Sequence, residues 1–245
     1  MTLKMKNKII LVGDVHAEWQ HLKYSIDEVH QHENAYIIQV GDFGIGFHHE
    51  SEEKRSLFSL NKVLEERNCH LFAIRGNHDN PSFFKERNHP YGYENITFLP
   101  DYSELDLLGK SILLVGGAVS VDRYCRLEGK SYWSGEEFVL KLEHEFPYKD
   151  RQYDLVITHT RPGICGAFKG FANIKIFCDQ DYDLKNDLIE ESQLVDYLYE
   201  HTKPKDWIFG HFHKSNLVNY ENTDFRCLDI HEHYLYHCSD FECKE

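Results

Sequence analysis

Five short polar motifs hold the residues of this sequence that are best suited to chemistry. Each follows a run of apolar residues: Gly13-Asp14-Val15-His16, Gly41-Asp42, Gly76-Asn77-His78-Asp79, Thr158-His159-Thr160 and Gly210-His211-Phe212-His213. Carboxylate and amide oxygens together with imidazole nitrogens form a mixed ligand set that suits borderline divalent ions such as Mn²⁺, Fe²⁺, Zn²⁺ or Co²⁺. No motif contains a cysteine, so a thiolate site is not indicated. The motifs predict a divalent metal centre if the fold brings them together.

Taken singly, each motif also has an ordinary structural explanation. Asp14 and Asp42 suit a turn after a strand, and His159 suits a buried strand end. His211 and His213 alternate along an extended segment, so both side chains would lie on one face, as two ligands require. The shared position of all five motifs, after predicted strands, favours the metal centre.

The N-terminal third of the chain alternates between two apolar patterns. Short apolar runs predict strands over Lys8 to Val12, Ala35 to Val40 and His70 to Ile74, and apolar residues at helical spacing predict a helix between each pair. This βαβαβ pattern is typical of an α/β fold with parallel strands. Ligand sites in such sheets gather outside the carboxyl ends of the strands. Motifs that are far apart in the sequence can therefore converge.

The rest of the chain indicates a mixed sheet and a β-rich end. Ser134 to Glu137 fits a capping box and predicts a helix with apolar positions at Phe138, Leu142 and Phe146. A tight turn at Gly109-Lys110 predicts an antiparallel hairpin. The other expected elements are a helix over Asn186 to His201 and strands over Ser103 to Leu108, Ser111 to Val115, Tyr153 to Thr158, Asp206 to Phe209, Asn216 to Tyr220 and Phe225 to Ile230.

The composition predicts a single domain over residues 1–245 in the cytoplasm. Hydrophobic residues make up 41% of the chain, enough to bury a core without disulfides. The 27 Lys and Arg against 41 Asp and Glu give a net charge of −14, which argues against long nucleic acid or a membrane as a partner. Neither a membrane span nor a signal peptide is indicated. The seven cysteines lack a C-x-x-C pair and are expected to be reduced, mostly structural thiols.

The order of the motifs, GD-x-H, GD, GNHD, TH and GH-x-H, resembles the calcineurin-like metallophosphoesterase family over about residues 8 to 215. The segment Gly116 to Arg123 is similar to a stretch of its phage and bacterial members. The resemblance implies an α/β fold: a β-sandwich of mixed sheets flanked by helices, in α/β/β/α layers. It also implies two divalent ions, bridged by Asp42, with Asp14, His16 and His213 on one ion and Asn77, His159 and His211 on the other.

Two divalent ions beside two carboxylates leave a local positive charge that attracts phosphate. Such ions, with Mn²⁺ favoured and Fe, Zn, Co or Ni as alternatives, lower the pKa of a bridging water, and the resulting hydroxide attacks the ester. His78 is expected to contact the phosphate and act as a general acid, oriented by Asp79. A turn or helix N-cap before Pro81 is the alternative role of Asp79. Arg75 is expected to supply a nearby charge.

Further substrate contacts are expected from Asp122, Arg123 and Arg126, because an arginine fork matches phosphate; surface ion pairs are the alternative. Tyr124 and Trp133 suit either stacking on a substrate ring or plain aromatic packing. The remaining histidines are expected on the surface and receive no role: His30, His32, His48, His49, His231, His233 and His237.

The sequence departs from the family pattern at two places. Protein Ser/Thr phosphatases of the family show GD-x-x-D-R-G, whereas Phe43 to Phe47 follow Asp42, and Ala17 replaces a common glycine. The expected activity is therefore hydrolysis of a phosphate ester in a small phosphorylated molecule or nucleotide. A nuclease or cyclic-nucleotide phosphodiesterase would use the same ligands, and a non-catalytic binding scaffold is the alternative of a different class.

Overall fold

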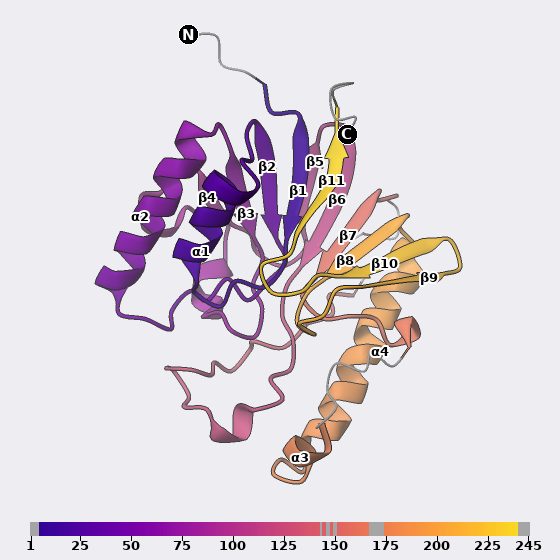
Figure 1. Cartoon of the computed structure of the whole chain (residues 1–245). Coiled ribbons are helices and arrows are strands. Elements are labelled where there is room, and N and C mark those ends of the chain that lie inside the picture. Colours follow the sequence, from indigo (N-terminus) through magenta and orange to yellow (C-terminus); the bar gives the residue numbers. More distant parts are fainter. Residues whose placement is uncertain (1–4, 143, 146–147, 149–150, 167–173, 240–245) are drawn as a thin grey trace.

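Two β-sheets pack face to face in the computed structural model, with helices on both outer faces (Figure 1). The structure describes residues 5–142, 144–145, 148, 151–166 and 174–239. The layers follow the order helix, sheet, sheet, helix, and both sheets contain parallel and antiparallel neighbours. The predicted α/β/β/α arrangement of mixed sheets is confirmed.

The first sheet contains the predicted βαβαβ unit. Its strand order is β11-β1-β2-β3-β4, in which β1 to β4 run parallel and β11 is antiparallel to β1. The strands are β1 (Lys8–Val12), β2 (Ala35–Gln39), β3 (His70–Ala73), β4 (Ile96–Phe98) and β11 (His233–Cys238). The outer face is covered by α1 (Trp19–Tyr24), a π-helical turn (Ser25–Val29) and α2 (Glu50–Glu66).

The second sheet has the order β5-β6-β7-β8-β10-β9, with four parallel strands at its centre and antiparallel partners at both edges. Helix α4 (Leu184–Thr202) covers its outer face (Figure 1). The strands are β5 (Ser103–Leu107), β6 (Lys110–Val115), β7 (Leu155–Thr158), β8 (Asp206–Phe209), β9 (Asn216–Tyr220) and β10 (Thr223–Cys227). Short helical segments are α3 (Ile174–Cys178) and 3₁₀ turns at Pro81–Phe84, Pro90–Gly92, Arg123–Cys125 and Gly163–Cys165.

Side-chain alternation along each strand builds three apolar layers. Ile9 and Leu11 of β1 face the second sheet, whereas Ile10 and Val12 pack against the helices. In β6, likewise, even-numbered residues face the first sheet and odd-numbered residues face α4. Both faces of these strands are buried, so their sequences are continuously apolar, as is typical of covered parallel sheets.

The helix predicted from Ser134 is wrong. The described residues from 134 to 142 contain turns, a bend and irregular backbone but no helix. The Arg75 guanidinium donates to the carbonyl oxygens of Gly135, Glu136 and Glu137, which a helix needs for its first i to i+4 hydrogen bonds. One apolar position of that helix, Phe146, lies outside the described residues.

The C-terminal region is β-rich, as predicted, but it contains a strand that the sequence did not indicate. After β10, the chain crosses back to the first sheet and adds β11 beside β1 (Figure 1). Within the described ranges, no helix combines the length and the apolar character needed to cross a membrane. Cys238 is disulfide-bonded, contrary to the expectation of reduced thiols, whereas five cysteines are free: Cys69, Cys125, Cys165, Cys178 and Cys227.

Candidate dinuclear metal centre

The five polar motifs follow β1, β2, β3, β7 and β8, which are all parallel members of their sheets. Their side chains meet where the carboxyl ends of the two sheets come together. Two groups of donor atoms form there, and in each group all donor atoms lie within 4.8 Å of one another: Asp14, His16, Asp42 and His213, and Asp42, His159 and His211. Asp42 belongs to both groups.

The first group is open to solvent on one side. Its donor atoms are close, since His213 Nε2 lies 3.1 Å from Asp14 Oδ2 and 2.9 Å from His16 Nε2. The carboxylates are fully buried, but the side chains of His16 and His213 are 23% and 43% exposed. A substrate can therefore approach this group over its histidines.

The second group is buried. His159 Nε2 lies 3.1 Å from Asp42 Oδ1 and 3.1 Å from Asn77 Oδ1, and the rings of His159 and His211 are 5.1 Å apart. The other ring nitrogen of His159, Nδ1, is 3.0 Å from the carbonyl oxygen of Val40. This contact orients the imidazole so that Nε2 points at Asp42, which is the arrangement of a metal-ligating histidine.

The charges of the buried residues suit a cation. Burial alone would raise the pKa of Asp42, but the charge and hydrogen bond of His159 outweigh it and hold that pKa well below its usual value. Burial would lower the pKa of His159, but the charge and hydrogen bond of Asp42 outweigh this effect and raise that pKa to about 9. Burial and the His159 charge keep the pKa of His211 well below its usual value. The positive charge of protonated His159 thus balances the negative charge of Asp42. A divalent ion can replace this proton as the positive charge beside Asp42.

A buried oxygen atom that lacks a hydrogen bond also indicates a metal site. Asp42 Oδ2 is buried and accepts no hydrogen bond from the described residues, although an unpaired buried carboxylate oxygen is costly. It lies 3.8 Å from His16 Nε2. Oxygen and imidazole nitrogen ligands in this mixture match Mn²⁺, Fe²⁺, Zn²⁺ and Co²⁺.

His78 and Arg126 lie together beside the open group. The His78 ring is 4.9 Å from the His16 ring, and its backbone N–H donates to Asp42 Oδ1 at 2.6 Å. An Arg126 guanidinium nitrogen is 2.5 Å from His78 Nε2 and 2.6 Å from Asp122 Oδ1. Burial, opposed by Asp42 and aided by Arg126, lowers the pKa of His78 to about 4.

Asp79 does not contact the His78 side chain; it binds backbone. Its buried carboxylate accepts hydrogen bonds from the N–H groups of Phe43, Gly44, Ile45 and Gly76. These contacts join the loop after β2, which carries Asp42, to the loop after β3. The geometry therefore fits a residue that positions the loops.

Arg123 also lies apart from the ligand groups. Its guanidinium forms ion pairs with Asp181 at 2.6 Å and Asp187 at 2.5 Å, and so connects the segment after β6 to the start of α4. The ring of Tyr124 lies 6.5 Å from that of Phe177. Trp133 meets the Phe47 ring edge to face at 4.9 Å. These contacts correspond to the ion-pair and packing alternatives.

Three buried residues that support the centre were not singled out from the sequence. Ser120 accepts a hydrogen bond from Asn77 Nδ2 and donates to the Glu136 carboxylate. Glu191 of α4 accepts from the Val119 N–H at 2.6 Å and the Thr160 hydroxyl at 3.1 Å. A signal existed for Glu191, because it occupies the core-facing stripe of an amphipathic helix, where a charged residue needs a partner.

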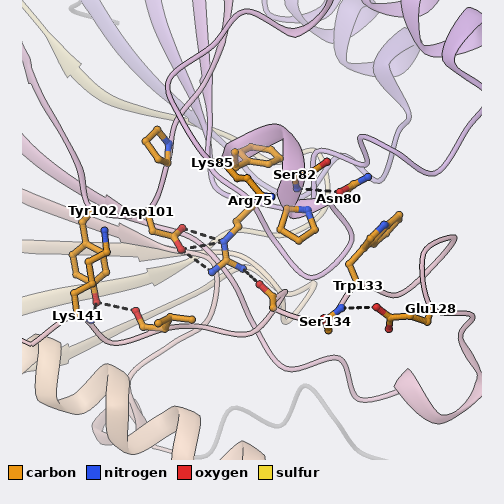
Figure 2. Close-up of a pocket in the computed structure, with 15 residues that line it drawn as sticks. Arg75, Asn80, Ser82, Lys85, Asp101, Tyr102, Glu128, Trp133, Ser134 and Lys141 are labelled. Carbon is orange, nitrogen blue, oxygen red and sulfur yellow. Dashed lines mark hydrogen bonds and ion pairs between the residues drawn. The ribbon is translucent and has the colours of Figure 1, made fainter.

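A pocket of about 590 Å³ adjoins the loop that carries Asn77 and His78. Arg75 lies at its centre, held by Asp101 at 2.7 Å (Figure 2). Trp133 lies at one end of the pocket, and Tyr102 and Lys141 lie at the other. Arg75, expected to supply a charge near the metals, instead anchors the pocket wall.

A family model described as calcineurin-like phosphoesterase matches residues 7–215. The chain therefore belongs to this family, whose members use dinuclear divalent metal centres, and it is a metal-dependent phosphoester hydrolase. No curated protein matches the sequence significantly.

Solved structures that are similar to this chain share little sequence with it. A phosphopantetheinyl hydrolase from Mycobacterium tuberculosis has 13% identity and a TM-score of 0.44, with 92% of this chain and 91% of that chain covered. An archaeal phosphodiesterase has 14% identity and a TM-score of 0.35, with 91% of this chain and 84% of that chain covered. A putative 5′-nucleotidase from Staphylococcus aureus has 12% identity and a TM-score of 0.47. The match covers 94% of this chain and 53% of that chain, so this chain spans about half of that protein.

Proposed function

We propose that the two donor groups hold two divalent ions bridged by Asp42, and that this centre hydrolyses the phosphate ester of a small molecule or nucleotide. The position of Asp42 carries the proposal. Its Oδ1 lies 3.1 Å from His159 Nε2 in the buried group, and its Oδ2 lies 3.8 Å from His16 Nε2 in the open group. Asn77 completes the buried set through Oδ1, which faces His159.

Mn²⁺ is the favoured ion, and Fe, Zn, Co or Ni are alternatives with the same ligand preferences. When bound, a pair of such ions supplies an activated water and neutralises the phosphoryl oxygens. Contacts within the protein hold these residues in place, because Val40 orients His159 and backbone contacts fix both loops.

His78 and Arg126 bind the phosphate on the solvent-facing side. Arginine can only donate, so His78 Nε2 accepts from Arg126 and the proton of the neutral imidazole lies on Nδ1. The pair thus offers a cation and a proton donor next to His16. We assign His78 to the leaving oxygen, to which its Nδ1–H donates a hydrogen bond, Arg126 to the phosphoryl oxygens, and Asp79 to loop positioning.

The net charge of the protein and the volume of a nearby pocket both favour a small substrate. A net charge of −14 repels long nucleic acid, and the pocket of about 590 Å³ beside the His78 loop can take the organic part of a phosphorylated metabolite or nucleotide. Trp133 at the pocket end offers an aromatic surface for a ring.

The test compares p-nitrophenyl phosphate with bis(p-nitrophenyl) phosphate in the presence of Mn²⁺. We expect hydrolysis by the wild type and a loss of at least ~100-fold in kcat/KM in Asp42→Asn, because the bridging charge is removed. Asp106→Asn, an exposed carboxylate on β5, is the matched control and keeps full activity. His78→Ala and Arg126→Ala should lower kcat without loss of metal.

Full activity in Asp42→Asn would contradict the bridged centre. The ester that is hydrolysed faster separates a phosphatase from the phosphodiesterase or nuclease alternative. Failure to hydrolyse either ester with Mn²⁺, Fe²⁺, Zn²⁺, Co²⁺ or Ni²⁺ would contradict a broad ester specificity.

A further inference from the structure

The turn that leads into β11 gathers five histidines on the helix-covered side of the first sheet: His21, His30, His32, His231 and His233. The rings of His21 and His231 stack with 4.3 Å between their centroids. Those of His30 and His233 lie 4.4 Å apart. Clustered imidazoles repel one another when protonated, and neutral imidazole is a common metal ligand. The expectation of unrelated surface histidines thus misses a cluster assembled from both ends of the chain.

The hydrogen bonds divide this cluster into two parts. His233 uses both ring nitrogens, since Nδ1 is 2.9 Å from His32 Nε2 and Nε2 is 2.9 Å from Ser25 Oγ. In that part, both ring nitrogens of His233 therefore have partners within the protein. In the other part, His231 Nε2 faces the carboxylate of Glu18, with Oε2 at 3.1 Å, and His21 lies beside them.

We infer that Glu18, His21 and His231 form a third metal site, which takes a single borderline divalent ion such as Zn²⁺. One donor atom from each residue lies within 4.8 Å of the other two. A tetrahedral zinc ion with bonds of about 2.0–2.2 Å places its ligand atoms roughly 3.3 Å apart. The Glu18–His231 pair already has that spacing, and the exposed His21 ring stacks on His231 beside it.

Local structure explains why these three residues meet. Glu18 directly precedes α1 and His21 lies three residues later, so both side chains lie on one face of the first helical turn. His231 has a left-handed backbone with φ 54°, and its N–H donates to the carbonyl oxygen of Asp14 at 3.0 Å. The segment that carries Glu18 and His21 and the segment that carries His231 are thereby held together next to β1.

This third site shares no side chain with the two groups around Asp42. The inference is therefore independent of the proposed function. Glu18 supplies the anionic ligand, the two histidines supply nitrogen, and the exposure of Glu18 and His21 leaves room for water as a fourth ligand. Such a set, two histidines and one carboxylate, is one that zinc uses in proteins.

The test counts Zn²⁺ bound per chain by equilibrium dialysis and elemental analysis of the full-length protein. We expect Glu18→Gln and His21→Ala each to bind one ion fewer than the wild type. Both substitutions are on exposed side chains and leave the fold intact. His30→Ala, an exposed histidine of the same cluster that does not contribute to the site, is the matched control and binds as many ions as the wild type.

Equal zinc content in the wild type and His21→Ala would overturn the inference. A loss of one ion in His30→Ala as well would also overturn it, because the ion would then be held loosely by the histidine-rich surface. Failure of the Asp42 centre is distinguishable, since it lowers the count equally in the wild type and in all three variants.

Discussion

Close backbone approach explains why glycine recurs in the motifs of the centre. A Cβ atom on Gly76 would lie 2.1 Å from Asp42 Oδ1, 2.3 Å from the Asp42 backbone nitrogen and 2.7 Å from His159 Nε2. A Cβ on Gly210 would lie 2.1 Å from Asp14 Oδ1. These distances are far below van der Waals contact, so no side chain fits without moving a ligand.

The substitution Gly76→Ala should therefore damage the centre although it adds a single methyl group. Asp42 and its loop must shift, so we expect fewer bound ions, a kcat/KM reduced at least ~100-fold, and a free energy of unfolding lowered by about 2 kcal/mol. Metal analysis, kinetics and urea unfolding measure these effects.

Gly163→Ala is the matched control for this change. Its added Cβ would lie 2.9 Å from Asp196 Oδ2 and 3.3 Å from Ser192 Cβ, and neither residue belongs to the proposed metal centre. Ion content and kcat/KM should match the wild type. If Gly76→Ala behaved like Gly163→Ala, the close approach of Gly76 to Asp42 would not limit the centre.

At the scale of elements, α4 is tied to the loops of the centre by one buried carboxylate. Glu191 connects the helix to Val119 after β6 and to Thr160, which follows His159. Burial raises the pKa of Glu191 to about 7. The folded protein thus holds a proton at this residue at pH values where the unfolded chain has released it.

This linkage fixes the sign of a pH effect. Between the unfolded pKa of about 4.5 and the folded pKa of about 7, the folded state binds more protons, so stability falls as pH rises. In Glu191→Gln that contribution is absent. Relative to the wild type, we expect the variant to gain about 2 kcal/mol in free energy of unfolding between pH 5 and pH 8.

Urea unfolding at the two pH values measures this gain. Glu190→Gln, on the exposed neighbouring residue, should show the same difference from the wild type at both pH values. An equal response of the two variants would show that Glu191 titrates normally in the folded protein.

Elements whose signals are local were predicted well, and those set by distant contacts were not. The strands of the βαβαβ unit are apolar runs, and the helix over Asn186 to His201 has a clear period, so the sequence alone located them. The capping box at Ser134 failed because Arg75, 60 residues away, takes the carbonyls of Gly135 and its neighbours. The strand β11 was missed because its partner is β1, at the other end of the chain.

The same distinction applies to the site. Metal-ligand candidates are recognisable because each follows a strand in a short motif, and the structure brings all seven together. The contacts of Arg126 with His78 and of Arg123 with Asp181 depend on loop paths. No spacing in the sequence distinguishes these two arginines.

At the scale of the whole molecule, the two sheets share one apolar layer. Ile9 and Leu11 of the first sheet pack in the same cluster as Ile112 and Ile157 of the second. Neither sheet can expose that face to water without losing the burial that stabilises it. We therefore propose a single domain that unfolds as one cooperative unit.

Tryptophan fluorescence can test this cooperativity. Trp19 of α1 is buried in the apolar layer outside the first sheet, and Trp207 of β8 is buried in the layer between the second sheet and α4. Two variants, Trp133→Phe/Trp207→Phe and Trp19→Phe/Trp133→Phe, leave one reporter in each layer. We expect the midpoint from fluorescence to coincide with that from far-ultraviolet circular dichroism within each variant, as for a two-state transition. A separate fluorescence transition in either variant would indicate two domains.

The return of the chain to β1 has a consequence for the timing of synthesis. β1 is made first, yet one of its two neighbours, β11, is made after all the other strands. Asp14, His16, Asp42 and Asn77 leave the ribosome long before His159, His211 and His213. Because chains grow at roughly 5–20 residues per second, synthesis from Asp14 to His213 takes about 10–40 seconds, during which the ligand sets are incomplete. Both proposed ligand sets become complete only when His213 has emerged, so we expect the centre to take up its second ion late in synthesis.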